Sequence, residues 1–168
     1  MQESKMQHNR EVSLMRPEEL DQVAELEQMC FSDPWLPGML ADTVSHSYDW
    51  IFVWREEDRV AGYGILRILG DEGEIQRIGV APHWRGRGIG RKLMEGMLGF
   101  SREKEAAAVA LEVRQSNEPA IQLYQSCGFV KEAVRKGYYH NPSEDAWIFW
   151  NRKIQEQIPV SPEITTKK

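Results

Sequence analysis

The residues best suited to bind a ligand form one short loop in which glycines and arginines alternate, Arg85-Gly86-Arg87-Gly88-Ile89-Gly90-Arg91. Glycines let the backbone come close to a ligand, and successive N–H groups at the start of a helix attract phosphate oxygens. The three arginines add positive charge. The loop therefore predicts a site for the pyrophosphate of a nucleotide-like cofactor. The alternative is a glycine-rich connection with a solvated basic surface.

Two other phosphate-binding loops fit these residues less well. A Walker A loop needs GxxxxGK followed by Ser or Thr, which this loop lacks. A dinucleotide-binding fingerprint needs GxGxxG and an acidic residue about twenty positions later, and Glu112 lies near that distance. However, the glycines read GxGxG, and the polar stretch Pro82-His83-Trp84-Arg85 separates them from the preceding strand. We therefore reject both interpretations.

One carboxylate interrupts the apolar run from Ala106 to Val113. Such a run predicts a buried strand, and alternation places Glu112 on the face opposite its two apolar neighbours. Glu112 is then either a general base or the ion-pair partner of Arg114 or of a lysine. From the residues alone the ion pair is the commoner case, because buried acids usually have partners.

A second candidate lies on a helix that follows this strand. Asn117 is a suitable N-cap, Pro119 fits the first turn, and Gly128 stands just past the end. Tyr124 lies seven residues after the cap, which is about two helical turns. A buried tyrosine at such a position is ordinarily part of the core.

The remaining candidates are less specific. Tyr138 and Tyr139 either pack across strands or line a groove, and Trp35 with its neighbours Phe31 and Pro34 could form another wall, although no spacing supports this. Three of the four histidines are scattered without the spacing of metal ligands, so no metal site is predicted: His46, His83 and His140.

Hydrophobic periodicity indicates the elements that must position these residues. Strands are expected near Val12 and over residues 50–54, 60–69, 74–80, 106–113, 129–139 and 146–150. Helices are expected after Pro17 and over residues 37–46, 88–100 and 117–124. The order βα(α)βββαβαββ predicts an α/β (α+β) fold, with a mixed sheet and helices on both faces.

Composition limits the class of protein. The chain has 168 residues, 41% of them hydrophobic, which suits one domain with a substantial core. Its net charge of -5 argues against a protein that mainly grips nucleic acid. Two distant cysteines and the lack of a long apolar run predict a cytoplasmic protein that does not enter membranes. We expect a disordered segment over 1–11, one domain over 12–153 and a polar tail over 154–168.

The ordered set of motifs resembles a known family. The loop Arg85-Gly86-Arg87-Gly88-Ile89-Gly90 matches [QR]xxGx[GA], the acetyl-coenzyme A loop of the GNAT acetyltransferases, and it follows Ile78-Gly79-Val80-Ala81-Pro82 as it does there. The second half is similar as well, over Leu111-Glu112-Val113-Arg114, Asn117, Ala120 to Tyr124, and Gly128-Phe129. Together with Tyr138-Tyr139 and Asp145-Ala146, this narrows the resemblance to RimI-type ribosomal-protein alanine N-acetyltransferases, over Val12 to Lys153.

The resemblance implies a fold, a cofactor and a role for each residue. The fold would be the GNAT fold, with a mostly antiparallel sheet of six to seven strands, and the acetyl donor would be acetyl-CoA. Glu112 would be the base, Tyr124 would protonate the departing thiolate, and Asn117 would contact the cofactor. Pantetheine would lie along Ile78, Gly79 and Val80, with the Val80 N–H facing the oxyanion, and the residues from Arg85 to Arg91 would hold the pyrophosphate. The peptide would lie between walls that contain Trp35, Tyr138 and Tyr139.

The implied substrate is a protein N-terminus, most specifically the N-terminal alanine of a small-subunit ribosomal protein. The alternatives are a GNAT enzyme for another amine (a lysine, a polyamine or an aminoglycoside) and a non-catalytic acetyl-CoA-binding module. Retention of Glu112 and Tyr124 argues against the module. We expect a monomer or weak dimer that binds neither nucleic acid nor membrane.

Overall fold

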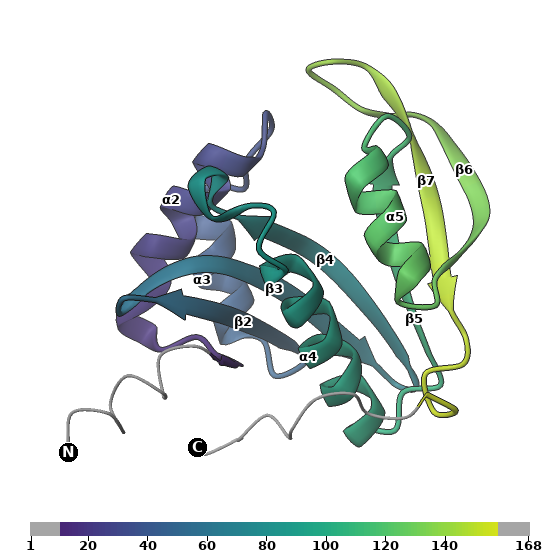
Figure 1. The fold of residues 1–168 in the computed structure, drawn as a ribbon, viewed down its shortest axis with the longest axis horizontal. Helices are drawn as coiled ribbons and strands as arrows, with labels where there is room; N and C mark the ends of the chain where they lie inside the picture. Colours follow the sequence, from purple (N-terminus) through teal and green to yellow (C-terminus); the bar gives the residue numbers. More distant parts are fainter. Residues whose placement is uncertain (1–10, 158–168) are drawn as a thin grey trace.

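The computed structural model describes residues 11–157, which form one seven-stranded sheet with helices on both faces (Figure 1). Apart from Glu11, the expected N-terminal segment lies outside the described residues, as do residues 158–168 of the expected tail. The strands are β1 (Val12–Leu14), β2 (Asp49–Glu56), β3 (Arg59–Leu69), β4 (Glu72–Val80), β5 (Ala108–Arg114), β6 (Val130–Tyr139) and β7 (Glu144–Asn151). Their order in the sheet is β1-β2-β3-β4-β5-β7-β6.

Only β4 and β5 are parallel among the neighbouring strands of the described sheet. The helices are α2 (Leu20–Cys30), α3 (Pro37–Ser45), α4 (Ile89–Glu103) and α5 (Glu118–Ser126). Two 3-10 turns, η1 (Pro17–Glu19) and η2 (Pro82–Trp84), precede α2 and follow β4. Helices α2 and α3 pack on one face, whereas α4 and α5 share the larger core on the other. The predicted mixed, mostly antiparallel sheet is confirmed.

The feature that positions the site is the separation of β4 from β5. The two strands pair only from Glu72 with Ala108 to Ile75 with Leu111. The next residue on β4, Gln76, is a β-bulge, because Leu66 and Ile65 of β3 pair with Ile75 and Arg77. A bulge bends its strand and increases the local twist. Beyond it β4 diverges from β5, and the sheet opens into the V visible in Figure 1.

The local signals predicted for α5 are present. The Asn117 side chain accepts a hydrogen bond from the Ala120 N–H at 3.3 Å, and Pro119 lies in the first turn. Gly128 follows the helix with φ of 91°, a conformation that glycine adopts without strain. These two ends fix the rotation of the helix that carries Tyr124.

The packed chain continues beyond the expected boundary at Lys153. Ile154 is fully buried in the larger core, and its carbonyl accepts a hydrogen bond from Arg102 of α4 at 2.7 Å. Gln155 also donates to the Ala106 carbonyl at 2.8 Å. The expectation of an unpacked polar tail from residue 154 is therefore wrong for these residues, because a single apolar side chain without periodicity gave no signal.

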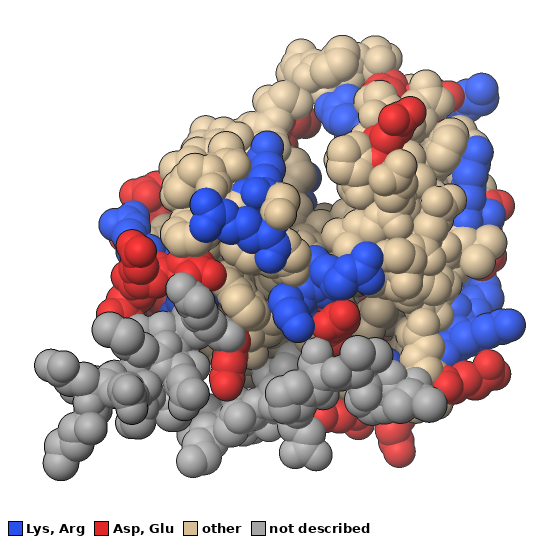
Figure 2. Space-filling model, in the orientation of Figure 1, with Lys and Arg blue, Asp and Glu red and all other residues tan. Residues whose placement is uncertain are grey.

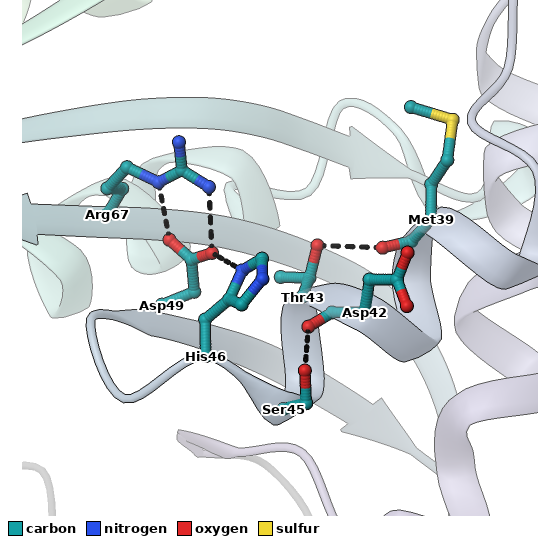
Figure 3. A network of polar contacts seen from close by, with 7 residues as sticks. All are labelled: Met39, Asp42, Thr43, Ser45, His46, Asp49 and Arg67. Atoms are coloured by element: carbon teal, nitrogen blue, oxygen red, sulfur yellow. Dashed lines mark hydrogen bonds and ion pairs between the residues drawn. The ribbon is translucent and has the colours of Figure 1, made fainter.

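A polar network links the end of α3 to the start of β2 and to the last part of β3 (Figure 3). Arg67 forms two hydrogen bonds to Asp49, at 2.8 and 2.9 Å, and His46 contacts the same carboxylate at 2.9 Å. Burial alone would raise the pKa of Asp49, but hydrogen bonds from Arg67 and His46 hold it below its usual range. This pair stabilises the fold and lies outside the cleft described next.

Candidate active site

A cleft of about 1040 Å³ opens where β4 and β5 part. Figure 2 shows the molecule hollowed between its two halves. One wall is the α2–α3 connection, and the other is the end of β6 with the loop that follows it. The cleft brings together seven predicted site residues from five separate segments: Trp35, Ile78, Glu112, Asn117, Tyr124, Tyr138 and Tyr139.

Glu112 lies on the face of β5 opposite the apolar core, as alternation predicted. Its neighbours Leu111 and Val113 are buried, whereas its own side chain is 23% exposed to the cleft side. Its Oε1 lies 3.4 Å from Nη1 of Arg135 on β6. The expected ion pair with Arg114 or a lysine is therefore wrong, because Arg135 is the partner and Arg114 turns toward the loop after β6.

A second carboxylate stands beside Glu112. Glu74 on β4 pairs with Ala110 on β5. Ala110 lies two positions before Glu112, so its side chain is on the same face of the sheet. Partial burial and the negative charge of Glu112 raise the pKa of Glu74. Two neighbouring acidic groups favour a cation, so this part of the site is suited to attract a protonated amine.

Tyr124 faces the same cleft from α5. Its side chain is only 6% exposed and packs against Phe129, with ring centroids 6.2 Å apart. Burial raises the pKa of its phenol well above the ordinary value, and Tyr139 adds to this effect. Tyr124 therefore keeps its proton and could donate it to a departing anion.

The free edge of β4 presents backbone groups toward the opening. The Ala81 N–H donates to the Ala61 carbonyl at 2.8 Å, and bonded and non-bonded pairs alternate along antiparallel strands. The N–H groups of Ile78 and Val80 therefore point away from β3, beyond the last pairing with β5. Gly79 instead directs its backbone groups toward β3, and a Cβ there would lie 3.0 Å from the ring of Tyr63.

The glycine-arginine loop begins α4 with a conformation suited to an anion. Gly86 and Gly88 have φ of 76° and 82°, and nothing lies within 4 Å of a Cβ built on either. The first helical bond runs from the Lys92 N–H to the Gly88 carbonyl. The N–H groups of the three preceding residues therefore have no partner within the helix, which fits a pyrophosphate.

The three arginines of this loop are held by neighbouring protein groups. Arg85 donates to the Val80 carbonyl at 3.0 Å, and Arg91 donates to Ser126 of α5 at 2.8 Å. Arg87 lies over the ring of Trp84, 4.6 Å from its centroid. In Figure 2, basic side chains gather over the segment between β4 and α4. This cationic surface supports the anion site predicted from the sequence.

Two further residues that could carry chemistry lie outside the cleft. His46 belongs to the network of Figure 3, and Cys127 is buried at the end of α5. Among residues 11–157 there is no group of three side chains that could hold a metal ion. The same range contains no helix long and apolar enough to cross a membrane.

Sequence reasoning missed the arginines that organise the cleft. Arg135 contacts Glu112, and Arg77 pairs with the buried Glu27 at 2.9 Å. These partners are separated by 23 and 50 positions, so no local pattern could reveal them. The strand of Arg77 also contains Glu72, Glu74 and Gln76, so an arginine there gave no distinct signal.

Comparison with known proteins agrees with this geometry. Residues 20–129 match the model of the acetyltransferase (GNAT) family. A putative [ribosomal protein bS18]-alanine N-acetyltransferase of Bacillus subtilis is 34% identical over 81% of this chain and 91% of its own length. The N-alpha-acetyltransferase RimI of Mycobacterium tuberculosis is 36% identical over 74% of this chain and 80% of its own length.

A solved structure shows the same fold. The crystal structure of the ribosomal-protein-S18-alanine N-acetyltransferase from Escherichia coli superimposes with a TM-score of 0.78 and 27% identity, over 94% of this chain and 97% of that one. The family match over most of the chain thus accompanies three structural features: the seven-stranded sheet, the divergence of β4 from β5 and the loop before α4. The chain belongs to the GNAT family of acetyltransferases.

Proposed function

We propose that this protein transfers the acetyl group of acetyl-CoA to the α-amine of a protein N-terminus, specifically the N-terminal alanine of the small-subunit ribosomal protein bS18. The relatives named for this reaction support the substrate, since their similarity covers most of both chains. The observation that carries the proposal is the cleft itself, which holds an acidic acceptor and a protonated tyrosine between two aromatic walls.

Glu112 acts as the general base. An α-amine has a pKa of about 7.7–8.0, so a large share is protonated at neutral pH and one proton must be removed before attack. Glu112 lines the cleft, and the charge of the neighbouring Glu74 adds to its attraction for the amine; Glu112 takes the proton. Arg135 restrains the Glu112 carboxylate through the 3.4 Å contact.

Tyr124 and the edge of β4 act on the thioester of acetyl-CoA, at its sulfur and at its carbonyl respectively. The Val80 N–H polarises the thioester carbonyl while the amine nitrogen bonds to its carbon. As the carbon–sulfur bond breaks, Tyr124 gives its proton to the sulfur, which leaves as a thiol. Glu112 passes the first amine proton to solvent, and the second proton that the nitrogen loses as the amide forms restores Tyr124 to its neutral phenol, so charge and protons balance. Ile78 continues the edge along which pantetheine lies, as an added strand would.

The loop before α4 anchors the other end of acetyl-CoA. The backbone from Gly86 to Gly90 and the arginines Arg85, Arg87 and Arg91 bind the pyrophosphate. Asn117 caps α5 with its side-chain oxygen and contacts the cofactor from the opposite side of the cleft. Gly79 contributes by allowing close packing of β4 on Tyr63, since its own backbone points to β3.

The peptide enters between the two walls. Trp35 lies on the α2–α3 side, and Tyr138 and Tyr139 lie on the β6 side, with Tyr138 45% exposed at the mouth. We place the enzyme in the cytoplasm, where its ribosomal-protein substrate is made. It acts as a monomer or weak dimer and needs neither nucleic acid nor membrane.

Intact-mass analysis of short peptides incubated with the protein and acetyl-CoA tests the proposal. The panel holds an alanine-initiated bS18 peptide, the same peptide with a blocked N-terminus, and both forms with an added internal lysine. We expect one acetyl group on each peptide with a free N-terminus and none on the blocked ones. Acetylation of the blocked lysine peptide would assign the protein to another amine substrate.

A further inference from the structure

Each of the two diverging strands carries an arginine that reaches one wall of the cleft. Arg77 lies on β4 and Arg114 on β5, both past the last paired residues of these strands, Ile75 and Leu111. Both arginines line the cleft. The walls they contact are loops, whose backbones have few strand or helix hydrogen bonds of their own.

Arg77 fastens the α2–α3 connection. It donates two hydrogen bonds to the fully buried Glu27, at 3.0 and 2.9 Å, and a third to the Asp33 carbonyl at 3.1 Å. Its guanidinium also stacks over the ring of Phe31, 3.9 Å from the centroid. Glu27 in turn accepts the N–H of Trp35 at 2.8 Å. Arg77 and Glu27 thus hold this wall at three places: the ring of Phe31, the carbonyl of Asp33 and the N–H of Trp35.

Arg114 fastens the opposite wall in a similar way. It donates to the carbonyls of His140 at 2.8 Å and Pro142 at 2.9 Å. Its guanidinium stacks on the ring of Tyr139, 4.5 Å from the centroid. Burial and the charge of Glu112 raise the pKa of Tyr139 to about 12, so this ring remains a neutral wall. A planar guanidinium can make these contacts together, whereas an ammonium cannot.

We propose that Arg77 and Arg114 are positioning residues that hold the two walls at a fixed separation and thereby set peptide affinity and selectivity for a small first residue. This inference rests on the proposed peptide substrate. A loop that must order on binding weakens affinity, because the cost of ordering is subtracted from the contacts made. Glu112 and Tyr124 lie on a strand and a helix, so the chemistry is little affected.

Steady-state kinetics of the variants Arg77→Lys and Arg114→Lys test the proposal with bS18 peptides that begin with alanine or leucine. We expect each variant to raise the peptide KM at least about tenfold, which corresponds to 1.4 kcal/mol. The KM for acetyl-CoA and kcat should stay within about twofold to threefold, as expected when only ground-state binding is lost. The preference for alanine over leucine should fall at least about fivefold.

The Glu19–Arg55 pair provides the matched control, because it is buried, has the same two-point geometry and lies outside the cleft. The double variant Glu19→Gln/Arg55→Gln should lower the melting temperature and leave the peptide KM unchanged. If Arg77→Lys does not fold, Glu27→Gln/Arg77→Gln replaces it, since removing both charges leaves no unpaired buried ion.

Three results would overturn the inference. These are an unchanged peptide KM in both lysine variants, an equal rise in the KM values for peptide and acetyl-CoA, and a rise in peptide KM in the control variant as large as that in the lysine variants. Failure of the proposed function is distinct, since the wild-type protein would then acetylate none of the peptides at the α-amine.

Discussion

Opposite environments surround the two side chains that we assign to proton transfer. Tyr124 is enclosed by the core, and burial raises the pKa of its phenol, so it holds its proton over the pH range of enzyme assays. Glu112 is partly exposed and contacts the cation Arg135. Burial thus suits one group to donate a proton, and access to the cleft suits the other to accept one.

Replacing Tyr124 with Phe removes only the hydroxyl group and should lower kcat on the order of 10²-fold. The KM for acetyl-CoA should change little, because the proton is transferred in the transition state. Tyr48→Phe, in the aromatic contact with His46 outside the cleft, is the control and should keep full activity. Equal kcat in Tyr124→Phe and wild type, with chemistry shown to be rate-limiting, removes Tyr124 from the mechanism.

At the level of elements, the site depends on the point where β4 leaves β5. The four paired residues of each strand hold the two halves together, and the bulge at Gln76 turns β4 aside. This exposes the N–H groups of Ile78 and Val80 and directs the chain into the loop before α4. The same divergence makes room for side chains from α2–α3 and β6–β7 to form opposite walls.

Substitution of Gly88 by Ala tests the loop before α4. The backbone φ of 82° is unfavourable for an L-residue, so the loop must shift and acetyl-CoA should bind at least about tenfold more weakly. Gly70→Ala is a matched control, because Gly70 has φ of 62°, equally open surroundings and a place in the β3–β4 turn. Calorimetry should show weaker binding in the first variant only. Equal affinities in two folded variants would mean that the pyrophosphate lies elsewhere.

Local signals made most elements predictable. The cap at Asn117, the glycine at Gly128 and the alternation around Glu112 depend on neighbours within a few residues, and the structure contains all three features. The walls of the cleft depend on contacts between distant segments, such as Glu27 with Arg77. The sequence therefore predicts which residues face the site, whereas their partners require the tertiary structure.

At the scale of the whole molecule, buried carboxylates that form ion pairs should make the free energy of unfolding depend on pH. The pKa of Asp49 is lower in the folded protein, so its contribution to stability is present above the unfolded value of about 3.9 and is lost as pH falls through the folded value. Asp49→Asn should therefore lower the melting temperature at neutral pH, and the difference from wild type should narrow as the pH falls below about 4.

The exposed Asp42 on α3 provides the control for this series. Asp42→Asn should match wild type at each pH, because its side chain takes no part in the network with Arg67. Thermal unfolding of the three proteins across the acid range makes the comparison. A constant difference between Asp49→Asn and wild type down to about pH 2 would show that the carboxylate contributes nothing through its ionisation.

The pH dependence of turnover by Glu112→Gln on the alanine-initiated peptide tests the assignment of the cleft most directly. Gln keeps the shape of Glu112 but cannot take a proton, so activity at neutral pH should fall on the order of 10²–10⁴-fold with the melting temperature nearly unchanged. The defect should shrink as pH rises past about 8, because the α-amine is then neutral without help. A folded variant with normal turnover across the whole pH range would contradict this account.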